Sequence, residues 1–146
     1  MLLRDLTSDA VENRQHAADT ARRLSEVRDG LQLLRTKAQM LIDIAATALA
    51  EGADEDWRTR GHLMLVAARV AQTPAQHRRC ANMLLASVND PRGVLRANAL
   101  DGLGIIAKTE TDLRQVVEPV LLQSLRAGSA AERVRARDAL AALESA

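Results

Sequence analysis

Aromatic residues are almost absent from this sequence. It contains no phenylalanine and no tyrosine, and Trp57 is its single aromatic residue. Aromatic rings are the usual platforms on which nucleic-acid bases stack, and they are also the usual anchors of protein interfaces. The sequence therefore excludes a row of stacking rings for single-stranded nucleic acid, and any interface must rely on other side chains.

Cysteine and long apolar runs are also scarce. The single cysteine, Cys80, excludes an internal disulfide and is typical of a reducing, cytoplasmic location. We expect it to be a small buried residue, since a reactive thiol would need a neighbouring base. The longest apolar stretches, such as 45–50, fall far short of the roughly 20 residues of a membrane span. No basic segment followed by an apolar one opens the chain, so neither a membrane anchor nor export is indicated.

Charge of one sign does not dominate either. Twenty basic and 19 acidic residues give a net charge of +1, which provides little long-range attraction to nucleic acid or to anionic membranes. Hydrophobic residues, by contrast, make up 47% of the 146 residues and recur at three- and four-residue spacing, with no alternating runs. This pattern predicts a single all-α domain.

Cap and turn signals divide the chain into helices. Thr73 to Gln76 form a capping box with proline at the first helical position, Ser129 to Glu132 form another, and Asp90 precedes Pro91 in a similar start. Left-handed glycine turns are expected to end helices at Gly30, Gly52 and Gly128. After a short segment at 1–6, the predicted helices span 8–28, 31–51, 54–72, 74–88, 91–108, 110–127 and 130–145.

An internal repeat with a period near 40 residues runs through the chain. The repeat is marked by a dipeptide step whose second residue is arginine and whose first residue is apolar in all but the first copy. The arginines of the four steps are Arg14, Arg58, Arg96 and Arg135, and they are separated by 44, 38 and 39 residues. Such a period is typical of stacked helical hairpins. Because one hairpin cannot bury both of its apolar faces alone, neighbouring hairpins must share a continuous core.

The segment 84–104 carries the pattern most clearly. A leucine pair is followed by the turn residue Asp90, the Leu95-Arg96 step, small residues and Leu103-Gly104. It resembles the second half of a HEAT repeat, and the resemblance extends over almost the whole chain. It implies a right-handed α-α solenoid of about four HEAT-like repeats, the first truncated, at approximately 1–28, 31–72, 74–108 and 110–145.

The resemblance also implies roles for individual residues. In the HEAT family the turn aspartate and the step arginine form a polar ladder between repeats, and Asp90 and Arg96 match that pair. Pro119 stands where the family commonly has a proline and should kink its helix. The apolar residues of segment 1–6 lack a hairpin of their own. We therefore expect the chain to be a piece of a longer protein, or to form a homo-oligomer through this open N-terminal end.

Catalytic and metal-binding patterns are weak. His16, His62 and His77 do not share the helical spacing of metal ligands, so we interpret them as structural or surface residues. The acidic cluster of Glu51 and 54–56 flanks a predicted helix start, which favours helix capping over acid–base chemistry. No nucleophile elbow, zinc-protease or nucleotide-binding motif occurs. The sequence predicts no cofactor, no metal and no enzymatic activity.

A set of polar residues suggests a binding surface instead. Second helices line the concave face of HEAT proteins, and the positions two residues after the step arginines should point outward there. The predicted partner-binding residues are His16, Arg60, Asn98, Asp101 and Arg137. The alternative is an ordinary solvated helix face.

The expected function is that of a non-catalytic protein-binding scaffold or adaptor. A nucleic-acid-binding HEAT-like domain, as in HEAT-like DNA glycosylases, is the alternative, and mixed charge disfavours it. An architectural resemblance to HEAT-like chromophore lyases leaves an enzymatic role as a third hypothesis.

Overall fold

The computed structural model describes residues 2–51 and 56–145, and all regular structure within these ranges is helical. The all-α prediction is therefore confirmed. The elements in chain order are α1 (Leu2–Leu6), α2 (Val11–Ser25), α3 (Arg28–Arg35), α4 (Ala38–Glu51), α5 (Trp57–Val70), α6 (Pro74–Ser87), α7 (Gly93–Thr109), the 3-10 turn η2 (Thr111–Leu113), α8 (Arg114–Ala127) and α9 (Ala130–Glu144).

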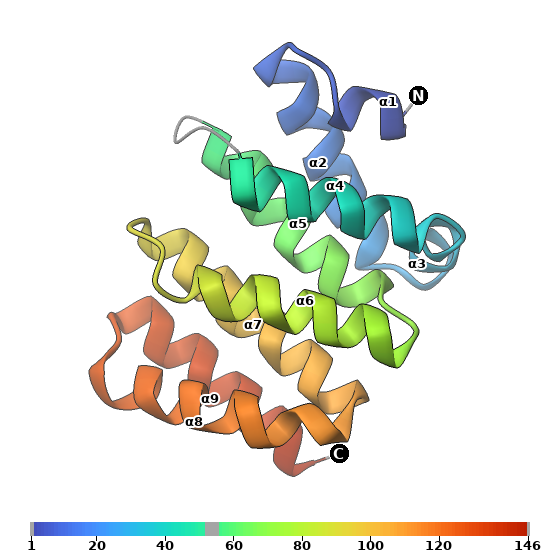
Figure 1. Cartoon of the computed structure of the whole chain (residues 1–146). Helices are drawn as coiled ribbons and strands as arrows, with labels where there is room; N and C mark the ends of the chain where they lie inside the picture. Colours follow the sequence, from blue (N-terminus) through green and yellow to red (C-terminus); the bar gives the residue numbers. More distant parts are fainter. Residues whose placement is uncertain (1, 52–55, 146) are drawn as a thin grey trace.

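The helices form consecutive antiparallel pairs arranged in two layers (Figure 1). The pairs are α1 with α2, α4 with α5, α6 with α7, and α8 with α9, while the short helix α3 joins the first pair to the second. Helices α4, α6 and α8 lie in front in Figure 1. Behind them, α2 contacts α5, α5 contacts α7, and α7 contacts α9. We call α2, α5, α7 and α9 the second helices, because each is the second member of its pair.

The left-handed conformation predicted for the glycine turns is wrong at the two described positions, although α8 does end at Gly128. Gly30 lies inside α3, where a Cβ atom would stand 2.3 Å from the carbonyl oxygen of Leu24. Close approach of two backbone segments, and not a left-handed conformation, therefore requires glycine there. Gly128 follows α8 with a φ of −76°, and Gly52 lies outside the described residues. The predicted helix 31–51 is divided between α3 and α4.

The helix starts follow the capping chemistry closely. Thr73 Oγ1 accepts a hydrogen bond from Gln76 N at 3.1 Å, and the Gln76 side chain accepts one from Thr73 N, so the capping box is confirmed. At α9 the Ser129 hydroxyl accepts from Glu132 N at 3.3 Å. The Glu132 carboxylate, however, does not complete a capping box but binds an arginine of α7. Helix α7 begins two residues later than predicted, at Gly93.

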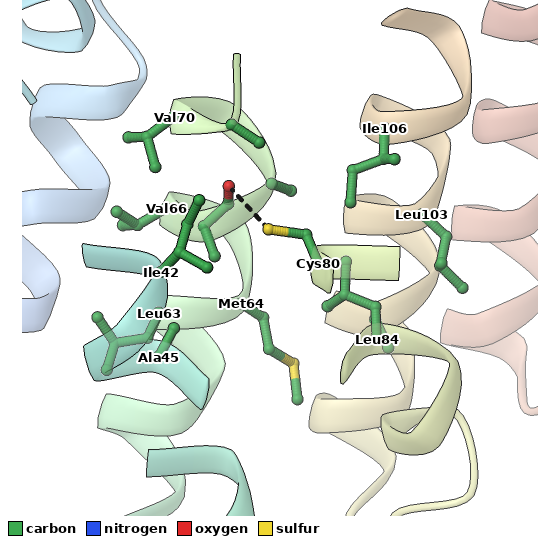
Figure 2. Close-up of a cluster of buried hydrophobic side chains, with 14 of the residues drawn as sticks. Ile42, Ala45, Leu63, Met64, Val66, Val70, Cys80, Leu84, Leu103 and Ile106 are labelled. Carbon is green, nitrogen blue, oxygen red and sulfur yellow. Dashed lines mark hydrogen bonds between the residues drawn. The ribbon is translucent and has the colours of Figure 1, made fainter. Parts of the chain in front are cut away.

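The core between the layers is built from aliphatic side chains and two sulfur-containing ones. Figure 2 shows Ile42 of α4, Leu63 and Met64 of α5, and Cys80 of α6 in one buried cluster with residues of α7. Cys80 is fully buried and donates from Sγ to the carbonyl oxygen of Ala67 at 3.5 Å. The predicted burial of Cys80 is confirmed.

Because of this burial, Cys80 is expected to be inert in the folded protein. Burial raises the pKa of the thiol to about 12, so only about one thiol in ten thousand is ionised at pH 8. In 8 M urea, which is roughly sufficient for full denaturation, a disulfide reagent such as DTNB should react with Cys80 stoichiometrically. In buffer, the same reaction should proceed only at the rate at which the whole protein unfolds. Rapid labelling of the native protein would contradict the assigned burial. The pKa of the Cys80 thiol is higher in the folded protein than in the unfolded chain. The contribution of this buried thiol to the free energy of unfolding is therefore present at neutral pH and is lost as the pH rises from about 9 toward 12.

Candidate partner-binding face

Equivalent arginines join the second helices to one another. Arg14, Arg60 and Arg96 are the fourth residues of α2, α5 and α7. Each binds a carboxylate at the start of the next second helix. The three ion pairs are Arg14 Nε to Asp56 Oδ2 at 2.9 Å, Arg60 Nη2 to Asp90 Oδ2 at 3.0 Å, and Arg96 Nε to Glu132 Oε1 at 2.9 Å. We call these three pairs the arginine ladder.

The first and third arginines of the ladder also hold their own preceding loops in the same way. Arg14 Nη1 donates to the carbonyl oxygens five and six residues before it, at 3.1 and 2.7 Å. Arg96 Nη1 makes the equivalent two bonds at 3.1 and 2.9 Å. Arg133, the fourth residue of α9, donates to the carbonyl oxygen of Gly128, again five residues before it. The four helix pairs therefore carry arginine at one common position.

This arrangement corrects the predicted ladder. Arg58 is not part of it, because its guanidinium lies over the ring of Trp57, 4.7 Å from the centroid. Arg135 pairs with Asp101. Asp90 and Arg96 both belong to the ladder, but Arg96 binds only the backbone of Asp90, whose carboxylate accepts from the preceding helix pair. The start of each second helix determines which of its arginines joins the ladder. The repeated dipeptide step does not mark that start.

The acidic cluster has a related outcome. Asp56 stands at the N-cap of α5 but makes no side-chain capping bond there. Its carboxylate binds Arg14, so its expected capping role is replaced by a contact between α2 and the start of α5. Residues 54 and 55 lie outside the described residues.

The five predicted partner-binding residues do not form one outward stripe. His16 and Arg137 are exposed, and Asp101 is half-buried. The expected outward position is wrong for Arg60, which is 9% exposed in the ladder, and for Asn98, which is 7% exposed. Asn98 donates from Nδ2 to the carbonyl oxygen of Gly61 at 3.2 Å, which ties α7 to α5. Both side chains are occupied by the packing of neighbouring second helices.

A different set of half-exposed side chains crosses all four second helices. Arg22 donates from Nη1 to His62 Nδ1 at 3.3 Å, and the Nη1 atom of Arg69 lies 3.9 Å from Glu26 Oε1. At the other end, Arg135 Nη1 lies 3.0 Å from Asp101 Oδ2. We call this set the charged face: Asp19, Arg22, Glu26, His62, Arg69, Asp101 and Arg135. The helical spacing of Asp19, Arg22, Arg23 and Glu26 is a signal in the sequence that could have indicated its first part.

The environment of the charged face alters the ionisation of three of its members. Burial, and then the charge of Arg22, lower the pKa of His62, which fits its role as an acceptor from that arginine. Burial raises the pKa of Asp101, and the charge of Arg135 opposes this shift. Burial also lowers the pKa of Arg69, with Glu26 acting against it. The face therefore consists of partly desolvated charges that need partners of opposite sign.

Two pockets open between the second helices along this face. One, of about 240 Å³, lies between α2, α5 and α7 and is lined by Arg22, Trp57, Arg58, His62 and Val94 among others. The other, of about 360 Å³, lies between α5, α7 and α9. Its lining includes Arg69, Asp101, Ile105, Lys108 and Asp138. The larger pocket is lined by charges of both signs, whereas the charged side chains that line the smaller one, Arg22 and Arg58, are basic.

Comparison with protein-family models, with curated proteins and with solved structures found no match. Within residues 2–51 and 56–145, no three His, Cys, Asp or Glu side chains are grouped so that they could hold a metal ion. Over the same described stretches, no helix combines the length and the apolar character that crossing a bilayer requires.

Proposed function

We propose that this chain is a right-handed solenoid of about four HEAT-like repeats that binds a protein partner and does not catalyse a reaction. The observation that carries the proposal is the charged face, a continuous row of acidic and basic side chains crossing α2, α5, α7 and α9. Stacked repeats present extended surfaces of this kind, and such surfaces are where repeat proteins bind. The common arginine position in the four pairs supports the repeat assignment.

The mixture of charges favours a protein partner over a nucleic acid. Asp19, Glu26 and Asp101 alternate with arginines on the same face. A phosphate backbone would meet these carboxylates at the same time as the basic residues, and like charges brought together in an interface are costly. A protein surface that carries both signs can match the pattern.

The exposed residues beside the pockets are the proposed contacts. Arg58, Lys108, Arg137 and Asp138 are exposed, and His16 extends the surface on α2. Trp57 is half-buried, and the guanidinium groups of Arg58 and Arg92 lie over its ring. An apolar side chain of the partner could enter the smaller pocket beside this ring, since tryptophan and arginine are frequent anchors of interfaces.

A charge-reversal pair tests this surface. Cellular partners are captured with the wild-type chain and with Arg58→Glu/Lys108→Glu, and we expect the variant to lose the specific partner at least about tenfold. The matched control is Arg78→Glu/Arg126→Glu, which reverses two exposed charges on α6 and α8 and should retain binding. Equal capture by both variants would remove the exposed residues beside the two pockets from the proposed contact surface.

A low-salt binding assay distinguishes the nucleic-acid alternative. Fluorescence anisotropy with labelled duplex and single-stranded oligonucleotides should give no saturable binding. If binding did occur and fell steeply with added salt, several phosphate contacts would be indicated. That result would favour the nucleic-acid function over the protein scaffold.

A further inference from the structure

His77 is a buried histidine that connects three successive helices. It is the fourth residue of α6 and is only 4% exposed. Its Nε2 atom lies 3.1 Å from the carbonyl oxygen of Ala71, the C-cap residue of α5. Its Nδ1 atom lies 3.0 Å from Oε2 of Glu110, the C-cap residue of α7. One imidazole ring therefore joins the start of α6 to the ends of the two second helices beside it.

Both partners of this ring are hydrogen-bond acceptors. A backbone carbonyl oxygen and an ionised carboxylate cannot donate, and a neutral imidazole has only one N–H group. In the neutral form, one ring nitrogen would therefore direct a lone pair at an oxygen and would stay without a partner inside the protein, which is unfavourable. In the imidazolium form both nitrogens donate, and both hydrogen bonds are made. The geometry around His77 thus favours the protonated ring.

The helix ends at this junction act on the same charge. The C-terminal ends of α5 and α7 carry the negative ends of their helix dipoles, which favour a cation beside Ala71 and Glu110. The start of α6 carries a positive dipole end, which acts in the opposite direction. Two negative helix ends and one carboxylate therefore face one positive helix end.

Glu110 is the charged side chain that pairs with His77 in the described part of the chain. The charged groups of the other elements around this junction bind elsewhere. Asp43 of α4 pairs with Arg79 of α6, Arg69 of α5 binds the Ser25 hydroxyl and pairs with Glu26, and Arg114 after η2 donates to the carbonyl oxygen of Ala107. Exposed to solvent are Lys37, Arg78, Lys108 and Asp112. The contacts that distinguish the two forms of the ring are therefore those with Ala71 and Glu110.

We propose that His77 is a proton-dependent clamp of the fold. Its imidazolium form holds the ends of α5 and α7 to the start of α6, and loss of the proton breaks one of the two hydrogen bonds. The last turns of α5 and α7 carry Arg69 and Lys108, which line the larger pocket of the charged face. The clamp therefore fixes two sides of that pocket. The inference concerns the folded chain itself and stands whether or not the charged face binds a protein.

NMR of the histidine rings tests the proposal on the wild-type chain. Long-range ¹H–¹⁵N correlations are recorded on the ¹⁵N-labelled protein at the pH at which the exposed His16 is half-protonated. We expect His77 to be mainly imidazolium there, with both ring nitrogens protonated. His62, whose Nδ1 atom accepts from Arg22 and whose pKa is lowered by burial, should be mainly neutral. A neutral His77 ring under these conditions overturns the proposal.

Two variants at the junction test the effect of the proton on the fold. Since the folded chain favours the protonated ring, the stabilisation is present below about pH 6.5, the usual value for histidine in an unfolded chain, and is lost as the pH rises above it. In urea denaturation between about pH 6 and 9, the folding equilibrium constant of the wild type should fall at least about threefold more than that of His77→Gln. Glu110→Gln keeps an oxygen acceptor but removes its charge, and should make His77 mainly neutral in the NMR measurement.

The matched control is His16→Gln, the same substitution at an exposed histidine, which should keep the pH dependence of the wild type. A difference between the wild type and His77→Gln that is constant with pH, or that grows as the pH rises, overturns the proposal. If His77→Gln does not fold, the ring protonation measured on the wild type and on Glu110→Gln decides it.

Discussion

Replacing Asp90 by alanine is expected to lower the free energy of unfolding by about 3 kcal/mol. The side chains of Arg60 and Asp90 are each only 11% exposed, and they join α5 to the start of α7. The variant leaves a buried guanidinium without its carboxylate, and Arg60 Nε already has no partner among the described residues. Removing one member of a buried ion pair costs more than the pair itself contributes, because the remaining charge stays desolvated. Urea denaturation followed by circular dichroism measures the loss.

An exposed ion pair of similar chemistry provides the control. Arg79 and Asp43 join α6 to α4 at the surface, with side chains 43% and 54% exposed. Asp43→Ala should change the free energy of unfolding by no more than about 0.5 kcal/mol. Asp90→Asn removes the negative charge but keeps an oxygen that can accept the hydrogen bond from Arg92 N, as Asp90 Oδ1 does. This variant therefore measures the contribution of the charge separately from that hydrogen bond. An effect of Asp90→Ala no larger than that of Asp43→Ala would show that the ladder does not stabilise the stacking of α5 and α7.

Replacing Gly104 by valine is expected to destabilise the protein by about 3 kcal/mol. Helices α7 and α9 approach closely at this position, where a Cβ atom on residue 104 would stand 2.7 Å from Ala139 Cβ and 3.4 Å from Ala139 Cα. The obstacle is a short side chain fixed to the backbone of a neighbouring helix, so α9 itself must move. The measurement is again urea denaturation, supported by the melting temperature.

Two further variants separate this clash from general effects of losing a glycine. Gly104→Val/Ala139→Gly should recover about half of the loss in stability, because the second change removes the Ala139 Cβ atom with which the new side chain clashes. Gly93→Ala at the start of α7 is the control, since its Cβ would meet only the end of the Arg96 side chain, at 3.3 Å. It should be neutral or stabilising by up to about 1 kcal/mol, as alanine is the better helix former. No recovery in the double variant would contradict the close approach of α7 and α9.

These two predictions probe the same structural property, the close stacking of the second helices. The arginine ladder fixes the start of one helix against the start of the next, and small residues such as Gly104 and Ala139 allow their axes to come close. The charged face depends on both features, because its ion pairs cross from one second helix to another. If the proposed function is right, variants that loosen the stacking should also weaken binding of the proposed partner, even though their side chains are buried.

The sequence predicted several local features of the protein correctly. The helical content, the capping box at Thr73, the proline within α8 and the burial of Cys80 are all present in the structure. Each depends on residues within a few positions of one another, or on hydrophobic periodicity along one helix. Such signals are complete within a short window of sequence. The assignment to HEAT-like repeats stays a proposal that extends this local pattern to the whole chain.

Only the tertiary structure decided which polar residues are buried between the helix pairs and which are exposed. Arg58 and Arg60 are two residues apart in one helix, yet one is exposed over Trp57 and the other is buried against Asp90. Asn98 is likewise held by the backbone of α5. The deciding contacts join residues 30 to 42 positions apart, and their register depends on where each helix begins and how closely its neighbour approaches. The register and the close approach of neighbouring helices result from side-chain packing across the whole core. A repeated dipeptide in the sequence does not indicate that packing.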